Sequence, residues 1–167
     1  MNIIKELDEW RFLLVSLIPH KVHSKIYSYK DLLTFFLLKF KPKKIIEFGT
    51  GKSTNIMADL LKDSEIVTIE HQRKWYYRWK WGLSKRVKIL LLDDNYSNPD
   101  YPDKYFDFAF IDGKDRENCM KSCFRLLKEG GYVMLHDYKD YRIPEGLIPV
   151  LKDDMTILLK INKKVGE

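Results

Sequence analysis

The chain has 167 residues, of which 45% are hydrophobic and 14% aromatic, so it can build one domain with its own core. Its formal net charge of +6 comes from 30 basic residues dispersed among 24 acidic ones, which does not by itself identify an acidic partner. The two cysteines, Cys119 and Cys123, exclude a disulfide framework, and no apolar stretch approaches the roughly 20 residues of a membrane span, so we expect one cytoplasmic domain over residues 1–167 without a membrane partner.

The first 42 residues carry two amphipathic helical patterns. Apolar residues recur at helical spacing from Ile3 to Leu14 and again from Leu32 to Leu37, with Pro19 and a polar stretch between the two. We interpret this segment, 1–42, as a helical lid or buttress.

From residue 43 onward, short β-type runs alternate with helical or loop segments. The runs cover 45–48, 65–70, 87–93, 106–112 and 132–137, and a last apolar run at 155–161 predicts one further strand. These alternations predict an α/β fold with a doubly wound, mostly parallel sheet, whose ligands bind beyond the carboxyl ends of the strands. We expect a ligand-binding core over 43–137 and a C-terminal completion over 138–167.

The segment 43–54, KKIIEFGTGKST, ends like a phosphate-binding loop. The motif G-x-x-x-x-G-K-[ST] would need its first glycine at the position of Ile46, so the wide loop of an NTPase is excluded. What remains is a strand, a tight turn and the start of a helix. In such a turn, Gly49 and Gly51 let a ligand approach the backbone closely, beside the helix N-terminus at Ser53.

Acidic residues stand at the predicted carboxyl end of each of the five strands, where a parallel sheet brings its ligands. An acid at every one of these positions is hard to explain by packing, so we expect a site there. In chain order, these residues are Glu47, Glu70, Asp93 with Asp94, Asp112, and Asp137 preceded by His136.

The acids indicate an adenosine-containing ligand. Glu70 is placed to accept hydrogen bonds from ribose hydroxyls, Asp93 or Asp94 suits the adenine amino group, and His71 can lie against the adenine ring. Nicotinamide dinucleotides and S-adenosylmethionine (SAM) both contain adenosine. Glu47, directly before the glycine turn, would repel a pyrophosphate but pair with an α-amino group, which favours SAM.

An ordered set of motifs then resembles the class I SAM-dependent methyltransferases, which implies their Rossmann-like fold. Between Lys43 and Asp137, IIEFGTGKST, TIEH, LLLDD, and YFDFAFIDG followed by LLKEGGYVMLHD are similar to the successive motifs of that class. Within it, IDGKDR followed by LHDY is similar to the catechol-type small-molecule O-methyltransferases. The resemblance implies methylation of a hydroxyl on a small molecule or a glycan.

The same resemblance implies catalytic and metal-binding roles. It suggests Asp112 and Asp137 as ligands of Mg²⁺ and Lys114 as the base. Independently of the resemblance, His136 is a second base candidate, because a histidine beside the acceptor hydroxyl can take its proton. This chain departs from the family pattern, because Lys114 is one residue closer to the strand and the usual Asp-Asn pair is replaced by His136 and Asp137. A histidine ligand would favour Mn²⁺, Fe²⁺ or Zn²⁺ over Mg²⁺. A site without metal, in which Asp112 contacts SAM or the acceptor, remains an alternative.

The segment 71–86, HQRKWYYRWKWGLSKR, interleaves cations with aromatic rings. It fits either a single-strand nucleic-acid platform or a helix whose Trp75, Tyr76 and Trp79 pack onto the sheet. Two alternatives to small-molecule methylation therefore stay open: an RNA ribose 2′-O-methyltransferase, and a SAM-binding interaction module without catalysis.

Overall fold

The computed structural model describes residues 29–162, which form one seven-stranded sheet with strand order β3-β2-β1-β4-β5-β7-β6. All six strand pairings of this sheet join neighbours in this order, and the four among β1 to β5 are parallel. The predicted doubly wound, mostly parallel sheet is therefore confirmed. The strands are β1 (Lys44–Phe48), β2 (Glu65–Glu70), β3 (Val87–Leu91), β4 (Phe106–Ile111), β5 (Leu127–His136), β6 (Leu147–Lys152) and β7 (Thr156–Ile161).

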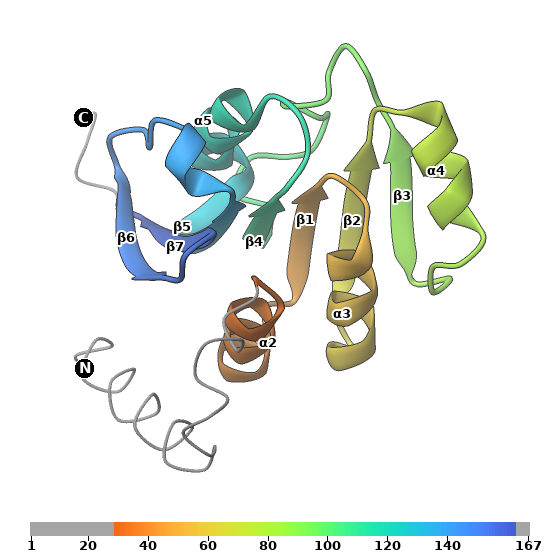
Figure 1. Ribbon diagram of the computed structural model, residues 1–167, viewed down its shortest axis with the longest axis horizontal. Coiled ribbons are helices and arrows are strands. Elements are labelled where there is room, and N and C mark those ends of the chain that lie inside the picture. The colour runs from red at the N-terminus through yellow and green to blue at the C-terminus, as the bar shows by residue number, and fades with distance from the viewer. Residues whose placement is uncertain (1–28, 163–167) are drawn as a thin grey trace.

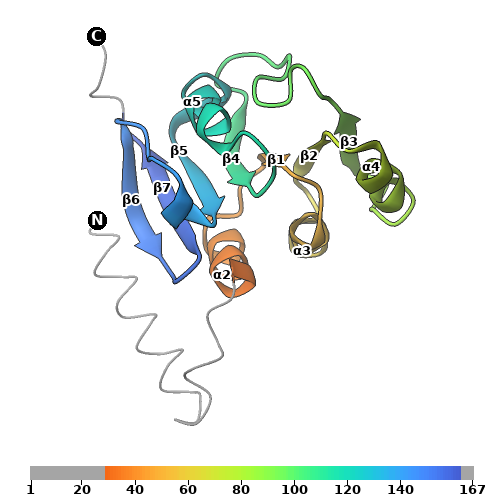
Figure 2. The same cartoon turned by 45° about the horizontal axis from the view of Figure 1, so that its top comes forward.

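Helices cover both faces of the sheet, as the oblique view in Figure 2 shows. On one face lie α2 and α3, on the other lies α5, and α4 flanks the β3 edge (Figure 1). The helices are α2 (Tyr29–Phe40), α3 (Lys52–Leu60), α4 (Arg73–Lys80) and α5 (Arg116–Leu126), and a 3-10 turn, η2 (Tyr138–Asp140), follows β5.

Alternation along the strands divides the core into two layers. Phe108 and Phe110 of β4 face α2 and α3, whereas Ala109 and Ile111 face α5. Because both faces are covered, the central strands are buried along nearly their whole length. This explains why they read as continuous apolar runs rather than as alternating ones.

Of the two amphipathic helices predicted before residue 43, one lies within the described residues. The apolar positions between Leu32 and Leu37 form the buried stripe of α2, and Cys119 and Cys123 are free, buried residues of α5. The predicted helix around Ile3 to Leu14 lies outside the described residues. The boundaries 1–42, 43–137 and 138–167 stay a prediction.

The C-terminal part corrects the prediction of a single strand after Asp137. The strand predicted at 155–161 is β7, which runs antiparallel to β5, and β6 pairs antiparallel with β7 as the edge of the sheet. The sequence pattern did not predict β6, because β6 is an edge strand. Pro149 lies within it and Ile148 is 47% exposed, so its apolar alternation is weak.

Within residues 29–162, no helix has the length and apolar character needed to cross a membrane.

Candidate functional site at the strand ends

The strand order reverses between β1 and β4, the switch point at which α/β sheets bind ligands. The turn after β1 is tied to both neighbours: Gly49 N donates to Ile69 O at 2.9 Å and Asp112 N donates to Phe48 O at 2.9 Å. Gly49 has φ +104, and a Cβ there would come within 2.7 Å of Gly113 N. The two loops are thus in close backbone contact at the centre of the predicted site, and Gly113 is a participant that the sequence reading missed.

Glu47 is fully buried behind this turn. Ser53 Oγ donates to one carboxylate oxygen and Thr54 Oγ1 to the other, both at 2.5 Å, so the carboxylate fastens β1 to the first turn of α3. Burial raises the pKa of Glu47 to about 7, against the lowering effect of these hydroxyl groups and with a smaller contribution from the charge of Asp112. Glu47 is therefore close to its titration point near neutral pH.

Glu70 ends β2 with only 3% of its surface exposed. Its Oε1 accepts from the backbone N–H groups of His71 and Gln72, each at 2.8 Å. These donors hold the carboxylate in one orientation. The His71 ring lies next to it, edge-on to Tyr96 with ring centroids 5.5 Å apart.

The predicted adenine side lies beyond β3. Asp93 and Asp94 are exposed, and Asp93 forms an ion pair with Lys114 from the loop after β4. The hydrogen bond from Lys114 lowers the pKa of Asp93. Lys114 also lies 5.5 Å above the ring of Tyr96, whose side chain is buried between the two loops. Lys114, which was predicted as the base, therefore lies on the predicted adenine side of the site.

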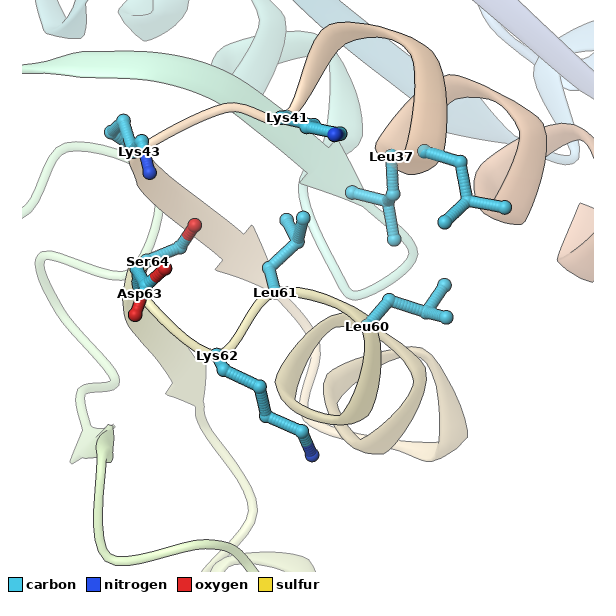
Figure 3. Close-up of a pocket in the computed structure, with 9 residues that line it drawn as sticks. Leu37, Lys41, Lys43, Leu60, Leu61, Lys62, Asp63 and Ser64 are labelled. Carbon is cyan, nitrogen blue, oxygen red and sulfur yellow. The ribbon is translucent and has the colours of Figure 1, made fainter.

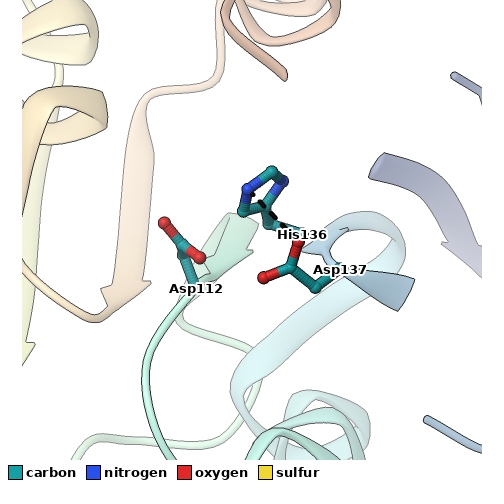
Figure 4. Close-up of side chains that lie close together, drawn as sticks. All are labelled: Asp112, His136 and Asp137. Carbon is teal, nitrogen blue, oxygen red and sulfur yellow. Dashed lines mark ion pairs between the residues drawn. The ribbon is translucent and has the colours of Figure 1, made fainter. Parts of the chain in front are cut away.

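A second group of side chains lies at the ends of β4 and β5. Asp112, His136 and Asp137 each offer a ligand atom, and these atoms lie within 4.8 Å of one another (Figure 4). His136 Nδ1 lies 3.1 Å from Thr156 Oγ1 on β7, while its Nε2 faces Asp137 Oδ1 at 3.5 Å. Thr156 is fully buried, so it fixes the ring and leaves Nε2 directed at the carboxylates.

Arg116, the first residue of α5, holds the two carboxylates of this group. Its guanidinium makes ion pairs of 3.2 Å with both Asp112 and Asp137 and donates to the backbone carbonyl of His136 at 2.6 Å. Only 10% of the Arg116 side chain is exposed, so these ion pairs are well shielded from water. The sequence reading did not single out Arg116, although its position four residues after Asp112 is the available signal.

Tyr29, at the start of α2, packs against this group. Its ring centroid lies 4.8 Å from that of His136. Burial raises the pKa of Tyr29, and the charges of Asp112 and Glu47 raise it further, which keeps the phenol protonated. Burial also raises the pKa of Asp112 despite the opposing charges of His136 and Arg116. The glycine turn and this group therefore belong to one electrostatic environment.

These residues fit a metal ion by their donor set. One imidazole and two carboxylates are ligands suited to Mn²⁺, Fe²⁺ or Zn²⁺. Arg116 binds one oxygen of each carboxylate, so the second oxygen of each is not bound by the arginine. The hydrogen bond to Thr156 also supplies the orienting contact that metal-binding histidines usually have.

The opposite end of the sheet carries a different hollow, of about 280 Å³, between the last turns of α2 and α3 (Figure 3). Lys43 and Ser64 on its wall directly precede β1 and β2, so it lies at the amino ends of the strands. It contains none of the predicted site residues.

Comparison with known proteins assigns the chain to a family. A family described as a methyltransferase domain matches residues 46–138, more than half of the chain. The chain belongs to this methyltransferase family. The predicted resemblance to SAM-dependent methyltransferases is confirmed.

Individual relatives agree with this assignment. A caffeoyl-CoA O-methyltransferase from Stellaria longipes is 28% identical over 157 residues, which cover 81% of this chain and 64% of the relative. The chain therefore spans less than two thirds of that relative's length.

Solved structures of other methyltransferases share the fold. A proposed caffeoyl-CoA O-methyltransferase from Staphylococcus aureus has a TM-score of 0.63 at 20% identity, covering 95% of this chain and 92% of that protein. A SAM-dependent methyltransferase from Aquifex aeolicus has a TM-score of 0.59 at 17% identity, covering 87% of this chain and 100% of that protein. The Rossmann-like methyltransferase fold is thereby confirmed.

Proposed function

We propose that this protein transfers the methyl group of SAM to a hydroxyl group of a small molecule. The observation that carries the proposal is the convergence of Asp112, His136 and Asp137 beside the glycine turn, in a chain of the methyltransferase family. The glycine turn, assigned to the cofactor, follows β1, and the group assigned to the acceptor begins at the end of the neighbouring strand β4.

In this proposal SAM lies across the carboxyl ends of β1, β2 and β3. Its ribose hydroxyls bind Glu70, whose carboxylate is already oriented by two backbone N–H groups. The adenine lies near His71, Asp93 and Asp94. The methionine part occupies the turn formed by Gly49 and Gly51, beside Glu47 and Ser53; a Cβ on Gly51 would meet no atom within 4 Å, so there is room for a ligand.

The acceptor lies between SAM and His136. Because the sulfonium already activates the methyl group, the protein has to align the acceptor oxygen with it and accept the hydroxyl proton. The S–CH₃ bond breaks as the O–CH₃ bond forms, and the proton passes to Nε2 of His136. Tyr29, kept protonated, is placed to donate a hydrogen bond to the acceptor oxygen, and Arg116 keeps Asp112 and Asp137 in position.

A metal ion at Asp112, His136 and Asp137 is the alternative arrangement of the same site. Bound there, it would lower the pKa of the acceptor hydroxyl. His136 would then be a ligand and not the base, and Lys114 would be the remaining base candidate.

The test is calorimetric titration with S-adenosylhomocysteine, with and without Mg²⁺ or Mn²⁺. We expect micromolar binding that Glu70→Ala weakens by roughly 10- to 150-fold, since hydrogen bonds to charged groups contribute about 1.5–3 kcal/mol. Glu145→Ala is the matched control, because this carboxylate is exposed and lies outside the cofactor site. No binding to the wild-type protein would refute the proposal.

A screen with labelled SAM then identifies the acceptor class. Labelled small-molecule hydroxyls would support the proposal, while a labelled glycan, which none of the relatives named above suggests, would redirect it. A labelled RNA ribose would favour the 2′-O-methyltransferase alternative. Cofactor binding with no labelled product would favour the non-catalytic module.

A further inference from the structure

The outer surface of α4 exposes large aromatic side chains. Trp75 is 37% exposed, Tyr77 56% and Trp81, directly after the helix, 85%. None of the eight residues of α4 is fully buried, although Trp75 and Trp79, two of the rings expected to pack inward, are partly covered: Trp75 Nε1 donates to Thr50 O and Trp79 Nε1 is buried. Exposed rings of this size in close succession are unusual on a protein surface and indicate a binding face.

The same surface is basic. From 71 to 92 the sequence has no carboxylate and seven cations: Arg73, Lys74, Arg78, Lys80, Lys85, Arg86 and Lys88. Arg86 has a structural use, because its guanidinium donates to Ala58 O at 2.8 Å at the end of α3. Within residues 29–162, no ion pair joins any cation of α4 to a carboxylate. This charge is therefore available to an anionic partner.

Rings and cations alternate on this face. Tyr77 and Trp81 are four positions apart and so share one side of the helix. The Lys80 ammonium lies 6.0 Å from the Trp81 ring, and the Arg78 guanidinium lies 4.8 Å from the Trp75 ring. Rings that stack on bases beside cations that pair with phosphates are the two components of single-strand nucleic-acid binding.

An anionic membrane fits this face less well. An interfacial membrane helix needs a continuous apolar side, and α4, RKWYYRWK, contains no aliphatic residue. A nucleic-acid duplex also fits less well, because its stacked bases do not offer their faces to protruding rings.

We propose that the outer face of α4, formed by Arg73, Lys74, Tyr77, Arg78, Lys80 and Trp81, docks single-stranded nucleic acid. The face adjoins the cofactor turn, since Trp75 Nε1 donates to Thr50 O at 2.8 Å, and α4 lies at the β3 edge of the sheet (Figure 1). The proposal does not depend on which molecule accepts the methyl group.

The experiment is fluorescence anisotropy of a labelled single-stranded RNA of mixed sequence, titrated with the full-length protein at several salt concentrations. For Lys74→Gln/Lys80→Gln we expect the slope of log K against log salt to become shallower by about 1.4, because each phosphate contact contributes about 0.7. For Tyr77→Ser/Trp81→Ser, which preserves the charge, we expect affinity to fall roughly tenfold per ring at an unchanged slope.

The control variant is Lys62→Gln/Lys121→Gln. It removes one exposed lysine just after α3 and one on α5, and it should leave the affinity and the salt slope unchanged. Thermal unfolding checks that each variant is folded, independently of any cofactor. Equal binding by wild type and both α4 variants would overturn the proposal. So would a loss confined to the lysine variant, which would indicate a plain charged surface, or a preference for anionic vesicles or duplex over the single strand.

Discussion

His136 and Lys114 are the two candidates for taking the acceptor proton, and the structure places them differently. His136 belongs to the group with Asp112 and Asp137, whereas Lys114 forms an ion pair with Asp93. We expect His136→Ala to lower kcat roughly 100-fold and Lys114→Met to lower it less, with S-adenosylhomocysteine affinity nearly unchanged in the first variant. Single-turnover methylation of an acceptor from the screen measures both.

The comparison is informative in either direction. A larger loss in Lys114→Met would identify the lysine as the base and favour a metal at His136. Full activity in both variants would remove both residues from the mechanism. Lys139→Met, an exposed lysine on η2, serves as the control for a general charge effect.

Glu47 predicts a pH dependence of stability. Its pKa is raised from 4.5 to about 7, so the folded state holds a proton that the unfolded state releases. The contribution to stability is fully present below about pH 4.5 and is lost as the pH rises through 7, and its total is about 3 kcal/mol.

Glu47→Gln should abolish this contribution, while its amide oxygen still accepts from one of the hydroxyls of Ser53 and Thr54 and its NH2 group can donate to the other. Urea unfolding at pH 5 and pH 8 measures it, as the difference between wild type and variant. Glu145→Gln should behave like the wild type. If Glu47→Gln lost stability between the two pH values as steeply as the wild type, the buried proton would have to lie elsewhere.

At the level of elements, the turn joining β1 to α3 contains two glycines with different physical roles. Gly49 combines positive φ with backbone contact to Gly113, whereas Gly51 has extended backbone and open space beside it. We expect Gly49→Ala to cost about 2–4 kcal/mol of stability, from strain and overpacking together. Gly51→Ala should cost less than about 1 kcal/mol.

Chemical denaturation compares the two variants, and calorimetry adds the cofactor. Because the space beside Gly51 is assigned to the methionine part of SAM, Gly51→Ala should weaken cofactor binding while remaining stable. Equal stability of the two variants would contradict the role given to the contact with Gly113.

The elements also show what a sequence pattern can and cannot predict. The buried strands β1, β2 and β4 can be predicted from continuous apolar runs, because helices cover both of their sides. The acids near their ends indicate the carboxyl edge of the sheet. The edge strand β6 pairs on one side alone and tolerates Pro149, so its pattern resembles a loop. The rings of α4 have helical spacing, but spacing does not say whether a sheet lies beneath them.

Over the whole molecule, the residues foreseen at the site are those carried by the ends of β1 to β5. Three of the missed participants, Tyr29, Arg116 and Thr156, come from α2, α5 and β7. Their contacts with the group around His136 depend on how these elements pack on the sheet, which no local spacing reveals. The sheet topology was therefore more predictable than the surroundings of its reactive groups.

The hydrogen bond from Trp75 to Thr50 has an optical consequence. The indole is partly exposed on α4, and its nitrogen is bonded to the backbone of the turn assigned to the cofactor. Indole emission responds to hydration and to hydrogen bonding, so the protein contains an intrinsic fluorophore positioned between its two proposed binding regions. We expect occupancy of either region to change the emission of Trp75, which is one of the four tryptophans of the chain.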